Sequence, residues 1–276
     1  MRAVAVPWTN RYINEVLSDA APGSLQRRGF YISSNEVYSF VQGPDPNNPT
    51  VHNATEMASE QLQAFSHLAM VQERHSLEVW PLINVGDGGS TCCVYSDSMT
   101  RLEGYASLAY GLKGFAWYCW GWGLWNLTIN QPAPAYQYVK AVNHDAQAWH
   151  KVKKDAEWRG MLETGWWVDC QKSPITANGK DCQGGAPAFN RGVAPRRDTV
   201  VTSMSEDLLV GVFPPQRPSR SEPAATGFLL VVDKRLDNWA GRTPLRNVTL
   251  TLSKVVGSVD FVPGGGGSTE DAERRF

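Results

Sequence analysis

The chain has 276 residues, 42% of them hydrophobic and 11% aromatic, which is ample apolar material for a buried core. Its formal net charge is -1 and it has no long basic run, which argues against nucleic acid or an anionic membrane as partner. The sequence has no apolar run of about 18 residues that would span a bilayer. The apolar section at its N-terminus, before Pro7, is too short to be expected to serve as a secretory signal. These totals predict a soluble globular protein.

The first half of the sequence alternates between strand-like and helical patterns. Short apolar runs of strand type lie at 29–40, 77–86 and 114–120. Helical periodicity follows each of them, near 53–74, 100–112 and 136–152, and the first two helices are expected to begin at the capping boxes Asn53/Glu56 and Thr100/Glu103. Strands alternating with helices predict a parallel sheet with helical crossovers, either an open sheet or part of a barrel. No GxGxxG or GxxxxGK[ST] motif follows a strand, so we favour the barrel.

After residue 155 the helical period disappears. Short strand-like runs separated by Pro, Gly and Asn occupy 158–170, 198–205, 207–213, 227–234 and 247–255. The sequence therefore predicts α/β plus all-β architecture, with a partial (β/α) TIM-type barrel over residues 1–154. An antiparallel β-sandwich with a flexible Gly-rich tail is expected over residues 155–276.

The cysteines and sequons bear on the cellular compartment. The five cysteines show no CxxC or Cys/His spacing typical of zinc, so neither a metal nor a cofactor is predicted. Cys170 and Cys182 flank a polar loop that a disulfide would close. The sequence Asn-X-Thr begins at Asn53, Asn126 and Asn247. These features favour an exported protein, with chance occurrence of the tripeptide as the alternative.

Tryptophan is concentrated between residues 114 and 126. Alternation along the predicted strand places Trp117 on one face and Trp120 on the other, and Trp120 and Trp122 lie at or beyond the end of the strand. Indole rings stack on the apolar faces of sugars and donate an N–H to their hydroxyls. The cluster indicates a saccharide-binding surface. Core packing is the alternative, and for Trp117 it is the preferred one.

Residues 101–122, RLEGYASLAYGLKGFAWYCWGW, and the helix at 135–149 resemble the last helix and eighth strand of TIM-barrel glycoside hydrolases. The clan is the one that includes family 42 β-galactosidases. The resemblance extends more weakly to 31–40 as a sixth strand, to 77–86 as a seventh, and to the β-domain that often follows such barrels. It implies hydrolysis of O-glycosidic bonds with a saccharide as partner. A full barrel takes roughly 250 residues, so only its C-terminal units would be present.

Two carboxyl groups are candidates for the chemistry. The resemblance implies an Asn-Glu acid/base pair on the fourth strand and a nucleophilic Glu on the seventh. Here Asn35-Glu36 lies on the expected sixth strand, and the seventh ends in Asn84 with Asp87 three residues later. We therefore take Glu36 and Asp87 as catalytic candidates, expected about 5–5.5 Å apart in a retaining enzyme and about 6.5–9.5 Å apart in an inverting one. A solvated loop glutamate and a turn aspartate are the alternatives.

The substrate would be held by polar and aromatic side chains around these carboxyl groups. The predicted substrate-binding residues are Tyr38, Asn84, Trp117, Trp120 and Trp122. A non-catalytic glycan-binding module, or an inactive fragment of a longer glycosidase, is the alternative function.

Overall fold

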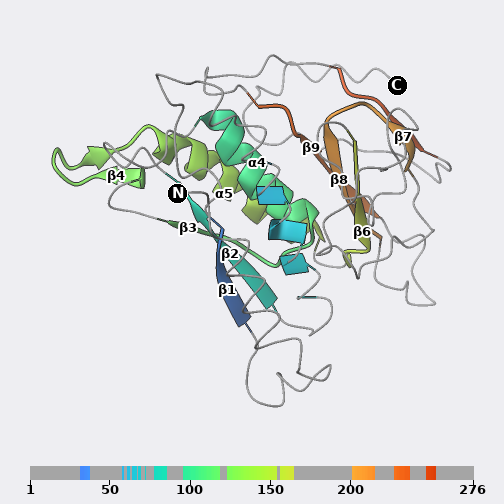
Figure 1. The fold of residues 1–276 in the computed structure, drawn as a ribbon, viewed down its shortest axis with the longest axis horizontal. Coiled ribbons are helices and arrows are strands. Elements are labelled where there is room, and N and C mark those ends of the chain that lie inside the picture. The colour runs from blue at the N-terminus through green and yellow to red at the C-terminus, as the bar shows by residue number, and fades with distance from the viewer. Residues whose placement is uncertain are drawn as a thin grey trace.

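The computed structural model describes residues 32–37, parts of 58–72, 78–85, 96–118, 123–153, 156–164, 201–214, 227–236 and 247–252. Helix α4 (Asp97–Ala109) lies between a parallel sheet and a set of antiparallel strands, and helix α5 (Ala135–Val152) runs beside α4 (Figure 1).

The parallel sheet consists of β1 (Ile32–Val37), β2 (Glu78–Asn84) and β3 (Ala116–Tyr118). Its order is β1-β2-β3, and both pairs are parallel. Each strand lies inside one of the apolar runs at 29–40, 77–86 and 114–120, so the predicted strands and their parallel pairing are confirmed.

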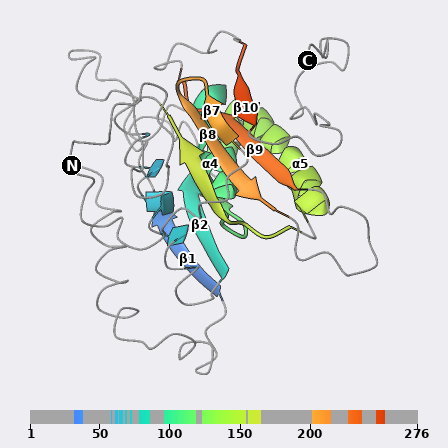
Figure 2. The ribbon, with the colours of Figure 1, turned by 90° about the vertical axis from the view of Figure 1, so that its right-hand side faces the viewer.

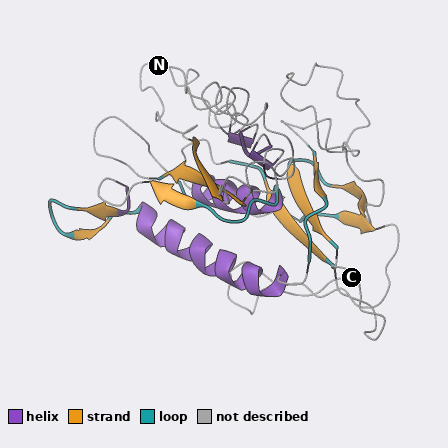
Figure 3. Ribbon diagram, turned by 90° about the horizontal axis from the view of Figure 1, so that it is seen from below, coloured by secondary structure: helices purple, strands orange, loops and turns teal. Residues whose placement is uncertain are grey.

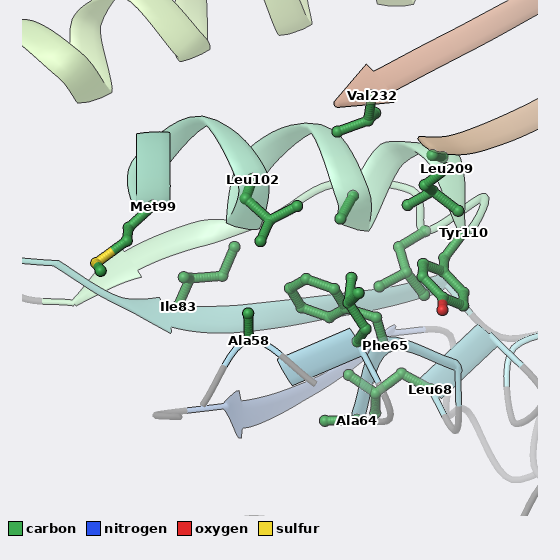
Figure 4. Close-up of a cluster of buried hydrophobic side chains, with 14 of the residues drawn as sticks. Ala58, Ala64, Phe65, Leu68, Ile83, Met99, Leu102, Tyr110, Leu209 and Val232 are labelled. Carbon is green, nitrogen blue, oxygen red and sulfur yellow. The ribbon is translucent and has the colours of Figure 1, made fainter. Parts of the chain in front are cut away.

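One face of β2 is covered by helices. Val79 and Ile83 are completely buried, whereas the alternating residues Glu78 and Trp80 are exposed. The buried face shares one core cluster with α4 and with the helical residues described between 58 and 72 (Figure 4). Its members include Ala58, Phe65, Leu68, Ile83, Met99 and Leu102. The helices of both crossovers therefore pack on the same face of the sheet.

Helix α4 begins one turn earlier than predicted. Ser96 is the N-cap, and its Oγ accepts a hydrogen bond from the Met99 backbone N–H at 3.3 Å. Thr100 lies inside the helix, where its hydroxyl donates to the Ser96 carbonyl at 3.0 Å, and Glu103 is buried. The prediction of a capping box formed by Thr100 and Glu103 was therefore wrong, because Ser96 already caps the first turn and tertiary packing covers Glu103.

Helix α4 ends in a Schellman motif. The N–H of Gly111 donates to the Leu108 carbonyl at 2.9 Å, and the N–H of Leu112 donates to the Ser107 carbonyl at 3.1 Å. Gly111 has φ of 78°, a left-handed conformation that suits glycine. The chain turns sharply there and enters the segment that leads to β3.

The C-terminal part of the described chain forms two antiparallel sheets (Figure 2). Strands β6 (Gly160–Glu163), β8 (Leu208–Phe213) and β9 (Phe228–Asp233) pair in the order β6-β8-β9. Strand β7 (Val201–Met204) pairs with β10 (Leu250–Leu252). All five strands lie within the strand-like runs read from the sequence, so these strand predictions are confirmed.

Strand β8 is buried on both faces. Leu209 belongs to the core cluster of α4, whereas Leu208 and Val210 pack with residues of β7 in a second cluster. A Cβ on Gly211 would lie 2.6 Å from the Ala109 carbonyl oxygen, so the glycine permits the close approach of β8 to α4. The core is therefore continuous across the domain boundary expected near residue 155.

A short β-hairpin lies between β3 and α5. Strand β4 (Trp125–Asn126) pairs with β5 (Gln131–Pro132), and Asn130 in the turn has φ of 51°. The hairpin extends away from the rest of the structure, beyond the N-terminal end of α5 (Figure 3). Asparagine tolerates the left-handed conformation that the turn requires.

The C-terminal end of α5 packs on the antiparallel sheet. The Trp149 ring lies 5.0 Å from that of Phe213 and 6.2 Å from that of Phe228, measured between centroids. Lys153, which caps the helix, places Nζ 5.7 Å from the centroid of the Phe213 ring. Burial and the nearby charge of Lys113 lower the pKa of Lys153 to about 8.

This depressed pKa predicts a pH-dependent stability. Between about pH 8 and 10.5 the folded state holds Lys153 neutral while the unfolded chain still protonates it. Because the unfolded state binds more protons in this window, the free energy of unfolding should rise with pH there. Urea titrations of the native chain and Lys153→Met at pH 7.5, 8.5 and 9.5 would test this. An equal slope against pH in both proteins would contradict the assignment.

Candidate functional site

The carboxyl ends of β1, β2 and β3 meet at one edge of the parallel sheet. In the register, Glu36 pairs with Leu82 across β1 and β2, and Asn84 pairs with Tyr118 across β2 and β3. Asn84 is two residues beyond Leu82, so the Cα atoms of Glu36 and Asn84 are roughly 8 Å apart, given the strand spacing and rise. The fold therefore brings two of the predicted site residues to neighbouring backbone positions.

Aromatic residues lie on the face of the sheet opposite the helices. Tyr118 at the carboxyl edge is 42% exposed, and Trp80 is 39% exposed. The indole of Trp80 covers Gly114, where a Cβ would come within 3.1 Å of the ring. Neither Trp80 nor Tyr118 was among the predicted binding residues. Strand alternation in LEVWPLINVG and GFAWYCW could have identified both.

Trp117 lies on the other face of β3, against the helices. Its indole N–H donates to Asn143 Oδ1 of α5 at 2.8 Å, and its ring meets that of Phe115 edge to face at 5.2 Å between centroids. A Cβ on Gly104 of α4 would lie 3.6 Å from the same indole. These contacts agree with the interpretation of Trp117 as a packing residue rather than a ligand-binding one.

Four other predicted site residues lie outside the described residues: Tyr38, Asp87, Trp120 and Trp122. Their positions, including the separation between the Glu36 and Asp87 carboxyl groups, stay predictions. The same holds for Cys170, Cys182 and the sequon at Asn53.

A buried polar network lies where α4 meets the antiparallel sheet. Tyr110, Glu163 and Lys234 are completely buried, and the Tyr110 hydroxyl donates to Glu163 Oε1 at 2.6 Å. Burial lowers the pKa of Lys234, and the negative charges of Glu163 and Asp207 oppose that shift. The sequence did not reveal this network, because its members come from the end of α4, from β6 and from the residue after β9.

A second polar cluster of half-buried side chains joins α4 and α5. Arg101 pairs with Asp97 at 2.9 Å, and the Tyr105 hydroxyl donates a short hydrogen bond to Asp145 of α5. Burial, followed by the hydrogen bond to Asp145, raises the pKa of Tyr105. The phenol therefore stays protonated at neutral pH and fixes α4 against α5.

The described residues contain no group of three or more His, Cys, Asp or Glu side chains arranged to hold a metal ion. Within the same residues, every helix is too short or too polar to cross a membrane.

No protein-family model, curated protein sequence or solved structure matches this chain.

Proposed function

We propose that the chain is a carbohydrate-active protein of the glycoside hydrolase type, with saccharide bound at the carboxyl edge of β1-β2-β3. The observation that carries this proposal is the exposed side chain of Tyr118, whose backbone pairs with that of Asn84 at this edge, with Glu36 on the adjoining strand. An aromatic face, an amide and a carboxyl group together offer what a sugar needs: a surface for its C–H groups and partners for its hydroxyls.

The topology supports the same proposal. Strand order follows chain order, and the crossover helices pack on one face, as in consecutive units of a (β/α) barrel. In such barrels the catalytic groups sit at the carboxyl ends of the strands. The second core cluster, between β6-β8-β9 and β7-β10, supports a small β-sandwich after the barrel units.

The spacing of the exposed aromatic residues favours an oligosaccharide over a single sugar. Tyr118 pairs with Asn84, and Trp80 lies four residues before Asn84 on β2. The two aromatic residues are therefore about 13 Å apart along the strand direction. That distance is longer than one sugar ring. The two aromatic rings would then contact different units of one chain.

Glu36 is the proposed general acid. It would protonate the glycosidic oxygen as the bond from that oxygen to the anomeric carbon breaks. A second carboxyl group, for which Asp87 is the candidate, would attack the anomeric carbon or activate a water molecule. A site that binds saccharide without the second carboxyl group would be the non-catalytic glycan-binding module.

Tyr118→Ala is expected to weaken oligosaccharide binding by about 0.5–1.5 kcal/mol, or roughly twofold to twelvefold in Kd, because one stacking surface is lost. Glycan-array screening selects the oligosaccharide, and calorimetry with the folded chain measures the affinity. Val248→Ala is the matched control, since Val248 is 43% exposed but lies in the antiparallel part. If Tyr118→Ala and the native chain bound the oligosaccharide with equal affinity, Tyr118 would not be a stacking surface for the sugar.

A panel of chromogenic aryl glycosides then separates hydrolysis from binding. Turnover by the native chain that Glu36→Gln abolishes, with oligosaccharide binding retained, is the result expected of a hydrolase. Binding without turnover would identify the glycan-binding alternative. A chain that neither binds any arrayed glycan nor cleaves any aryl glycoside would overturn the proposal.

A further inference from the structure

The turn between β4 and β5 presents the tripeptide Asn126-Leu127-Thr128 to solvent. All three residues are exposed, at the end of a hairpin that extends away from the helices and sheets (Figures 1 and 3). Leu127 is 63% exposed and Ile129 is 60% exposed, the two largest exposures among the large hydrophobic side chains of the described residues. An apolar turn so open to water is a surface that a covering group would protect.

The hydrogen bonds of Asn126 leave its amide nitrogen accessible. Its Oδ1 accepts from the backbone N–H groups of Thr128 at 3.0 Å and Ile129 at 3.3 Å. Within the described part of the chain, no hydrogen bond involves Nδ2 or the Thr128 hydroxyl. A substituent on Nδ2 would therefore leave both bonds that shape the turn in place.

The other described sequon is arranged differently. At Asn247-Val248-Thr249, the N–H of Thr249 donates to Ser205 Oγ at 2.8 Å, and its carbonyl accepts from the Ser205 N–H at 2.9 Å. Its third residue is thus held against the residue that follows β7. The hairpin sequon has no such tie to the rest of the described structure.

We propose that Asn126 is an N-glycosylation site and that its glycan covers the apolar turn of the hairpin. The sugar donor would be a lipid-linked oligosaccharide pyrophosphate. The bond from the anomeric carbon to the pyrophosphate oxygen breaks, and a bond from that carbon to Asn126 Nδ2 forms. Nδ2 loses one proton to a base of the transferring enzyme, the lipid pyrophosphate leaves with the electron pair of the broken bond, and no oxidation or reduction takes place. This inference is independent of the proposed saccharide-binding site.

Translation of the full chain behind an added signal peptide, with endoplasmic-reticulum microsomes, tests the acceptor. Protease protection selects translocated chains, and glycosidase treatment in ¹⁸O-water marks each occupied asparagine by its conversion to labelled aspartate. Label is expected at Asn126, with loss in Asn126→Gln and Thr128→Ala and retention in Thr128→Ser. Asn247→Gln, the matched control, should leave label at 126 unchanged. A protected native chain without label at Asn126 would overturn the proposal.

A second measurement tests whether the glycan covers the apolar turn. The glycan should be released from the folded chain without denaturant, and its release should increase binding of a hydrophobic dye. Leu127→Ser/Ile129→Ser should abolish that increase while keeping the sequon. Release that requires unfolding, or dye binding unchanged by release, would contradict a glycan exposed over this turn.

Discussion

Lys234→Met is expected to destabilise the folded chain by about 3–5 kcal/mol, since it removes one partner of a buried charged pair. Lys234 and Glu163 are both completely buried; burial lowers the pKa of Lys234, and the negative charges of Glu163 and Asp207 oppose that shift. Without the ammonium group, a buried carboxyl group keeps the hydrogen bond from Tyr110 but loses its cation. Equilibrium urea unfolding followed by circular dichroism measures the loss.

A double-mutant cycle separates this pair from simple loss of packing. In Glu163→Gln/Lys234→Met both buried charges are gone, and the amide oxygen of the glutamine can still accept from Tyr110. The double variant should therefore be more stable than Lys234→Met alone, with a coupling in the range of about 0.5–3 kcal/mol. Additive losses would show that the two charges do not interact. Tyr110→Phe, which removes only one hydroxyl, should cost less than Lys234→Met.

Gly111→Ala is expected to cost about 2–5 kcal/mol in unfolding free energy. The left-handed backbone, with φ of 78°, contributes roughly 1–2 kcal/mol of this, and steric overlap contributes about 1–3 kcal/mol. An added Cβ would come within 2.8 Å of Cδ1 of Trp158 and closer still to Cγ. The same indole donates to the Ala109 carbonyl at 2.8 Å, so displacing it also exposes the end of α4.

Gly104→Ala is the matched control on the same helix. A Cβ there would overlap Cγ1 of Val142, but Gly104 lies inside α4, where alanine is favoured over glycine by about 0.5–1 kcal/mol. The control therefore tests overlap without backbone strain, and its net cost should be smaller. A loss at Gly111 no greater than that at Gly104 would show that the turn accepts alanine.

Local pattern was sufficient for most of the secondary structure. The alternation of Val79 and Ile83 with Glu78 and Trp80 is already visible in the sequence, and it corresponds to the buried and open faces of β2. The helical period of α4 and α5 similarly depends on residues three and four positions apart. These periodic patterns can be recognised in the sequence because each strand or helix has its own apolar face.

The sequence pattern failed at two places, the start of α4 and the hairpin of β4 and β5. Thr100 and Glu103 have the spacing of a capping box, yet Ser96 caps α4 and Glu103 is covered by tertiary packing. The hairpin at Trp125–Asn126 and Gln131–Pro132 is too short to show alternation in sequence. The start of α4 was misassigned because burial of Glu103 depends on tertiary packing, and the hairpin was missed because two-residue strands carry no periodicity.

Residue patterns along the chain were enough to predict the order of strands and helices, the parallel pairing in the first half and the run of short strands in the second. The three-dimensional structure was needed to place residues from distant segments: Glu36 and Asn84 at neighbouring backbone positions, Tyr118 on the open face of the sheet with Trp117 under the helices, and Tyr110 with Glu163 and Lys234 in the core. The two kinds of information differ in the sequence distance over which the interactions act. Periodicity is set by neighbours along the chain, whereas register and buried charge pairing depend on segments that are distant in sequence.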